Sequence, residues 1–125
     1  MPYFLRILRE GRVTLDLAEG YGRCTPYLLE KAGFVVLADL SAKELEVGRD
    51  LLSNLKNVDF VRLGMLNPPF RKEIFDGIWF TQAFEYVPPD KLKGFISEVS
   101  RMLKPRGVFF GNMEGSQFGG SSRLT

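Results

Sequence analysis

Two kinds of hydrophobic pattern alternate along this chain, and that alternation limits the folds open to it. Short apolar runs of strand length lead through polar or glycine-containing turns into stretches with apolar residues at helical spacing. Strands that alternate with helices form crossover units, which build a parallel sheet with helices on both faces. The sequence therefore predicts an α/β fold with buried strands at residues 12–17, 34–38, 58–63, 75–80 and 108–111.

The helical stretches between these runs carry start and stop signals. Residues 23–32 have a helical pattern that ends at a glycine. Ser41 and Glu44 form a capping box, in which each side chain satisfies a free backbone N–H at a helix start. The clearest helix starts at Pro88, keeps its apolar residues on one face and stops at the turn over residues 104–107.

Composition excludes several classes of chemistry. The chain has 125 residues, enough for one domain, and a formal net charge of +2, too small to indicate binding to nucleic acid or a membrane surface. It has no histidine and only one cysteine, Cys24, so neither a zinc site nor a histidine-activated nucleophile is expected. No apolar run approaches the ~20 residues that span a bilayer, and one free thiol fits a reducing compartment. We therefore expect a cytoplasmic protein.

The loop after the first strand is the first candidate for ligand binding. The segment from Asp16 to Gly22, DLAEGYG, joins a buried strand to a helix. Small residues there let the backbone approach a ligand at the amino end of the helix. Two glycines in a tight turn are also a common structural feature without a ligand, so the loop needs a second observation.

Asp39, at the end of the second strand, is the second candidate. A carboxylate there can accept hydrogen bonds from both hydroxyls of a ribose; alternatively, Asp39 only flanks the helix that Ser41 caps. Together in one β-α-β unit, the glycine loop and Asp39 favour a nucleoside cofactor. Thr25 replaces the third glycine of a dinucleotide fingerprint. The acidic Asp16 and Glu19 oppose a pyrophosphate and suit a cationic ligand, which favours S-adenosylmethionine over NAD.

Four segments, in this order, resemble the class I S-adenosylmethionine-dependent methyltransferases, particularly their small-molecule branch. The resemblance covers residues 12–112 and lies in VTLDLAEGYGR, FVVLADLS, FDGIWFTQAFEYVP and LKPRGVFF. It implies a three-layer, Rossmann-like fold with a parallel sheet of about five strands in the order 3-2-1-4-5. It also implies S-adenosylmethionine as the cofactor, S-adenosylhomocysteine as its product, and a small-molecule methyl acceptor.

The resemblance assigns the cofactor to residues that follow the strands. After the first strand, the acidic residue would help to hold the methionine amino group and the small residues would line the methionine portion. After the second, Asp39 would bind the ribose and Leu40 would pack on the adenine. Residues after the third and fourth strands would contact the adenine and border the methyl end. The full set is Asp16, Ala18, Gly20, Gly22, Asp39, Leu40, Met65, Thr81 and Gln82.

Glu85 and Tyr86, just after the fourth strand, are the candidate catalytic residues. Methyl transfer from a sulfonium depends mainly on holding the nucleophile in line, so the absence of histidine is compatible with it. Glu85 could act as a base or bind a cationic substrate. The alternative is that the two residues are a solvated acid and a packed ring at a helix start.

Some positions depart from the family pattern. Ala18 replaces the first motif glycine, Gly64 replaces an acid that commonly contacts the adenine, and Arg106 replaces a turn glycine. These departures support an alternative, a non-catalytic methyltransferase-like subunit with weak or no cofactor binding. Asn67-Pro-Pro-Phe70 matches the signature of amino-group methyltransferases, but it follows the third strand rather than the fourth. A proline-rich turn is therefore expected there.

The end of the chain also differs from the family, which continues with a helix and an antiparallel hairpin. We expect a cofactor-binding domain at residues 1–113 and a flexible Gly/Ser-rich tail at residues 114–125. The fifth strand would then be an open edge that pairs readily with other chains. A homodimer or a partner chain is expected to cover that edge, or the chain is a fragment.

Overall fold

Six strands form one sheet in this computed structural model, which describes residues 12–17, 22–64, 67–80, 87–111 and 121–122. The strand order is β3-β2-β1-β4-β5-β6. The first five strands are mutually parallel, which confirms the predicted order 3-2-1-4-5, and β6 is antiparallel to β5. The strands are β1 (Val13–Leu17), β2 (Phe34–Asp39), β3 (Val58–Arg62), β4 (Phe75–Phe80), β5 (Leu103–Gly111) and β6 (Ser121–Ser122).

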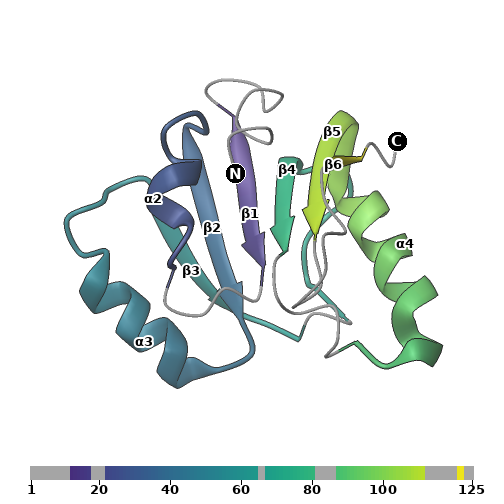
Figure 1. The fold of residues 1–125 in the computed structure, drawn as a ribbon, viewed down its shortest axis with the longest axis horizontal. Coiled ribbons are helices and arrows are strands. Elements are labelled where there is room, and N and C mark those ends of the chain that lie inside the picture. The colour runs from purple at the N-terminus through teal and green to yellow at the C-terminus, as the bar shows by residue number, and fades with distance from the viewer. Residues whose placement is uncertain (1–11, 18–21, 65–66, 81–86, 112–120, 123–125) are drawn as a thin grey trace.

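Helices cover both faces of the sheet, as predicted. The helices are α2 (Thr25–Leu28), α3 (Ala42–Leu51) and α4 (Leu92–Met102), the last preceded by a 3-10 turn, η2 (Pro89–Lys91). Figure 1 shows α3 beside β2 and β3, and α4 at the other side of the molecule beside β5. The described residues contain no helix that is long and apolar enough to cross a membrane.

The strands supply alternate residues to the two layers. On the α4 side, Leu15 and Ile78 belong to a large buried cluster that includes Phe95 of α4. On the other side, the core consists of two smaller clusters, one around Leu28 near α2 and one around Leu45 of α3. Every residue of β4 is buried, as expected for a central strand covered on both faces.

The helix starts and ends follow the sequence signals in part. The amide of Glu44 donates to Ser41 Oγ at 3.2 Å, so Ser41 caps α3 as predicted. The helix predicted over residues 23–32 is shorter, because only residues 25–28 are α-helical. Beyond it, the amides of Glu30 and Lys31 bond to carbonyls three residues back, which tightens the chain into turns.

The fifth strand begins earlier than predicted. It starts at Leu103, which pairs with Phe75, whereas the next pair joins Gly77 to Val108. Residues 104–107 therefore form a bulge in the pairing of β5 with β4. The sequence pattern predicted a turn there, before the strand. Arg106 adopts a positive φ of 70° within this bulge.

The prediction of an open edge at the fifth strand is wrong for part of that strand. Ser122 pairs with Phe109 and Ser121 with Phe110, so β6 occupies this stretch of the β5 edge. The remaining residues of the predicted tail, 114–120 and 123–125, lie outside the described residues.

Candidate functional site

The carboxyl ends of β1, β2 and β4 meet at one edge of the sheet. Asp16 lies opposite Leu37 of β2 on one side and Trp79 of β4 on the other. The chain leaves β1 toward β2 and later returns to β4 on the opposite side of β1, so the strand order reverses there. Open α/β sheets bind ligands at such a point. Four predicted site residues, Asp16, Gly22, Asp39 and Leu40, lie in the described part of this edge.

Asp39 is held at the last position of β2 and stays partly exposed. Its Oδ1 accepts a hydrogen bond from the amide of Ser41 at 2.9 Å. Its backbone carbonyl accepts from the amide of Leu63 at 3.0 Å. A carboxylate has about four lone-pair sites, so the bond to Ser41 orients Asp39 and leaves acceptor capacity for the hydroxyls of a ligand.

Leu40 presents an apolar surface directly beside that carboxylate. The residue is 63% exposed, so its apolar side chain is accessible to a ligand at this edge. Its carbonyl accepts from Nε of Arg62 at 2.9 Å, which fixes the backbone at the turn out of β2. The pair offers an acceptor for hydroxyls next to a platform for a flat ring.

Asp16 acts inside the protein rather than at its surface. The residue is fully buried, and its Oδ2 accepts from Thr25 Oγ1 at 2.8 Å. Thr25 is the first residue of α2, a helix whose N-cap, Cys24, makes no side-chain capping bond. Asp16 therefore fixes the start of α2 against β1 through its bond to Thr25.

Gly22 shapes the same loop by leaving room for side chains. Its φ is +80°, and a Cβ there would lie 2.6 Å from Leu52 Cδ1 and 3.1 Å from Leu37 Cδ2. Its carbonyl accepts from the amide of Thr25 at 3.2 Å. Glycine thus lets the loop turn and pack against α3 and β2.

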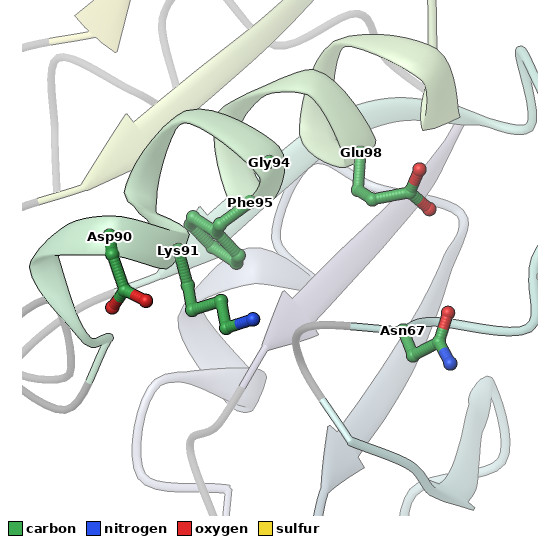
Figure 2. A pocket seen from close by; sticks show the side chains of 6 residues that line it. All are labelled: Asn67, Asp90, Lys91, Gly94, Phe95 and Glu98. Atoms are coloured by element: carbon green, nitrogen blue, oxygen red, sulfur yellow. The ribbon is translucent and has the colours of Figure 1, made fainter.

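Beside this edge, the loop after β3 borders a pocket of about 280 Å³. Figure 2 shows Asn67 on that loop, across the pocket from residues of η2 and α4. The sequence did not point to this pocket, although it did predict that residues 67–70 form a turn between the third and fourth strands, which the structure confirms. The lining residues are Asn67, Asp90, Lys91, Gly94, Phe95 and Glu98.

Gly64 lies in the same loop, where the family commonly has an acid. A Cβ at this position would meet no heavy atom within 4 Å, so a larger residue would fit there. The amide of Asn67 donates to the Gly64 carbonyl at 3.0 Å and closes the turn. In the described residues, no group of three or more Cys, Asp or Glu side chains could hold a metal ion.

Three further residues make polar contacts in this part of the molecule. These contacts join Thr25 to the Asp16 side chain, Arg62 to the Leu40 carbonyl and Arg101 to the Phe70 carbonyl. None of the three residues was among the site residues predicted from the sequence. Thr25 could have been suspected from its position just after the glycine loop.

The other predicted site residues lie outside the described part of the chain. They are Ala18, Gly20, Met65, Thr81, Gln82, Glu85 and Tyr86.

Comparison with known proteins identifies the class that this fold and site represent. Residues 14–107 match a protein family described as a methyltransferase domain. The chain belongs to this family, and the predicted membership of the class I S-adenosylmethionine-dependent methyltransferases is confirmed.

Individual relatives agree with this assignment. The chain is 36% identical over 106 residues to the ubiquinone/menaquinone biosynthesis C-methyltransferase UbiE of Haemophilus ducreyi, covering 80% of this chain and 40% of that protein. It is 36% identical over 97 residues to a demethylmenaquinone methyltransferase of Clavibacter sepedonicus, covering 78% of this chain and 39% of that protein. The chain thus spans about 40% of the length of these curated relatives.

Solved structures show the same fold. The PH0226 protein of Pyrococcus horikoshii superposes with a TM-score of 0.80 at 28% identity, over 88% of this chain and 52% of that one. A geranyl diphosphate C-methyltransferase of Streptomyces coelicolor superposes with a TM-score of 0.77 at 25% identity, over 88% and 41% of the two chains. The latter was solved with Mg²⁺, geranyl-S-thiolodiphosphate and S-adenosyl-L-homocysteine.

Proposed function

We propose that this domain binds S-adenosylmethionine at the carboxyl edge of β1, β2 and β4 and transfers its methyl group to a small-molecule acceptor. The observation that carries the proposal is Asp39, a partly exposed carboxylate at the end of β2, next to the exposed Leu40. Membership of a methyltransferase family supports the reaction, and the S-adenosyl-L-homocysteine in the Streptomyces relative supports the cofactor.

The residues of this edge fit such a cofactor. The carboxylate of Asp39 would accept hydrogen bonds from the ribose hydroxyls, and Leu40 would pack on the adenine. Asp16 and Thr25 would keep the start of α2 in place beside the methionine portion, through the bond that joins their side chains. The bound cofactor supplies a methyl group on a positively charged sulfur, so the protein mainly has to orient the acceptor toward it.

The acceptor is proposed only as a small molecule. The relatives include enzymes named for ubiquinone and menaquinone biosynthesis and one named for geranyl diphosphate. These names share methylation at carbon but not a common acceptor. Glu85 and Tyr86 remain the proposed catalytic residues, and Thr81 and Gln82 the proposed neighbours of the methyl group.

A non-catalytic role is the second candidate. Gly64 provides no side chain where the family commonly has an acid for the adenine, and Ala18 replaces the first glycine of the family's glycine-rich motif. Such a domain would serve as a subunit beside a partner chain or a second copy of itself. Absence of cofactor binding by the folded protein would favour this role.

The test is a calorimetric titration of the folded protein with S-adenosylmethionine and S-adenosylhomocysteine. We expect saturable binding that Asp39→Ala weakens by a factor of about 10 to 100, because bonds between a carboxylate and ribose hydroxyls are lost. Asp39→Asn should weaken it less, because the amide oxygen can still accept from Ser41. The control is Asp59→Ala, which removes an exposed carboxylate from β3 that bonds its own neighbour, Phe60. Equal affinity in Asp39→Ala and the parent would contradict the proposed site.

A further inference from the structure

The connection between β3 and β4 depends on hydrogen bonds from elsewhere in the fold. Its described residues, 63, 64 and 67–74, form no helix. Pro68 and Pro69 have no backbone N–H, so this stretch cannot build a regular ladder of its own. Instead, the amides of Glu73 and Ile74 donate to the carbonyls of residues 101 and 102, at 2.8 and 2.9 Å. The second half of the connection is thereby fixed to the end of α4.

The side chain of Arg101 fixes the first half. Its Nη1 donates to the carbonyl of Phe70 at 2.6 Å, and its Nη2 reaches the carbonyl of Pro68 at 3.5 Å. Its Nε and Nη2 also donate to Glu98 Oε1, at 3.1 and 2.7 Å. Glu98 therefore orients the guanidinium toward the two carbonyls. A lysine could not make this set of contacts, because its ammonium group lacks the planar fork of an arginine.

The other end of the connection leads to the candidate cofactor site. The amide of Leu63 donates to the carbonyl of Asp39, and the amide of Asn67 to that of Gly64, both at 3.0 Å. Together with the contacts of Arg101, these bonds hold separate points of the connection between Asp39 at the end of β2 and α4. A displacement of residues 67–70 would pull on the turn that neighbours Asp39.

Apolar packing secures only part of this connection. The ring of Phe70 meets that of Phe75 edge-on, with centroids 5.0 Å apart. Next to it, however, the pocket separates Asn67 from η2 and α4 (Figure 2). Side chains that do not touch cannot set a distance by close packing. Leu63 and Phe70 do pack in the same apolar cluster as Phe95 and other residues of α4, and the polar contacts at Arg101 add to that packing where Asn67 stands apart from the helix.

We propose that Arg101 is a positioning residue for the cofactor site. It holds residues 68–70 against α4 and so keeps the loop after β3 beside Asp39, without touching the ligand itself. The inference rests on the proposed function, because it assumes that an adenosyl cofactor lies against this loop. A purely structural Arg101 would lower the stability of the fold and leave the affinity of the folded protein unchanged.

The experiment compares the affinity of three variants for S-adenosylhomocysteine by calorimetry, at a temperature where circular dichroism shows each to be folded. Arg101→Ala should raise the dissociation constant about tenfold, as expected for a residue that acts through a network of contacts. Arg101→Lys keeps the charge and should lose most of the same affinity. Lys104→Ala is the control, because it removes another partly buried cation that contacts Asp76 of β4 and not the carbonyls of residues 68 and 70. Its dissociation constant should stay within about twofold of the parent.

Hydrogen exchange provides a second readout. The amide of Asn67 should exchange faster in Arg101→Ala and Arg101→Lys than in the parent, and at the parent rate in Lys104→Ala. Unchanged affinity in both Arg101 variants, with the parent binding normally, would overturn this inference alone. Equal losses in Lys104→Ala would also overturn it. A folded parent protein that does not bind the ligand would overturn the proposed function as well.

Discussion

Single residues at the carboxyl edge serve the fold and the proposed ligand together. Asp39 orients the turn through the amide of Ser41 and keeps acceptor capacity for a ribose. Asp16 is buried against Thr25, so removing it would disturb the start of α2 before any ligand was affected. Removing the Asp16 carboxylate would therefore change stability and affinity together, whereas a substitution that adds a group at an open position can change affinity alone.

Gly64→Asp is such a substitution. A Cβ at this position meets no heavy atom within 4 Å, and the family commonly has an acid there. We expect the new carboxylate to accept a hydrogen bond from the adenine amino group and to tighten S-adenosylhomocysteine binding about threefold to tenfold. Titration calorimetry measures the change. Gly94→Asp is the matched control, because the space around Gly94 is equally open and it lies on α4. Equal gains in both variants would indicate a non-specific effect of charge.

At the scale of elements, the sequence predicted what local patterns determine. The five parallel strands are short apolar runs between turn residues, and Ser41 begins α3 through a local capping contact. The start of β5 was missed because Leu103 joins the sheet by pairing with Phe75, a partner far away in the sequence. β6 was missed for a similar reason, since two serines have no strand pattern of their own and pair only where β5 lies.

The candidate site also has residues that the sequence could predict and contacts that it could not. Asp39 and Leu40 were predictable because they directly follow an apolar run, where a parallel sheet places its ligand. The contacts of Arg62 with Leu40 and of Arg101 with Phe70 join segments that are distant in the sequence. An arginine on an exposed strand or late in a helix has many partners open to it, and only the folded arrangement selects one.

The bulge in β5 leads to a prediction about its last two residues, Arg106 and Gly107. A Cβ on Gly107 would lie 2.8 Å from the Lys104 carbonyl oxygen and 2.9 Å from Leu103 Cδ2. Because the first contact is with backbone, Gly107→Ala should lower the free energy of unfolding by about 1–3 kcal/mol. Arg106→Gly is the matched change, since Arg106 has a φ of +70° that glycine adopts without strain. It should cost nothing or stabilise by up to about 1 kcal/mol. Urea unfolding distinguishes the two, and a smaller loss in Gly107→Ala than in Arg106→Gly would contradict this explanation.

At the scale of the whole molecule, the two ends of the sheet have different tasks. The carboxyl ends carry Asp39 and the neighbouring loops. At the amino ends, the buried Asp76 joins three strands, because its Oδ2 accepts from the amide of Val13 at 3.1 Å and from Lys104 Nζ at 3.4 Å. Val13 is the first residue of β1, and Lys104 is the second residue of β5. This carboxylate therefore holds three strands together at the end of the sheet away from the candidate site.

Asp76→Ala should therefore destabilise the protein without weakening its ligand binding. The amide of Val13 loses its partner, whereas the Lys104 side chain, 36% exposed, can still reach water, so the ion pair adds little. We expect the free energy of unfolding to fall by about 2 kcal/mol. In conditions where the variant is folded, its dissociation constant for S-adenosylhomocysteine should equal that of the parent. Asp39→Ala should show the reverse, a large loss of affinity with a smaller loss of stability. Urea unfolding and calorimetry on both variants test the separation, and a loss of affinity in Asp76→Ala as large as in Asp39→Ala would show that the two ends of the sheet are coupled.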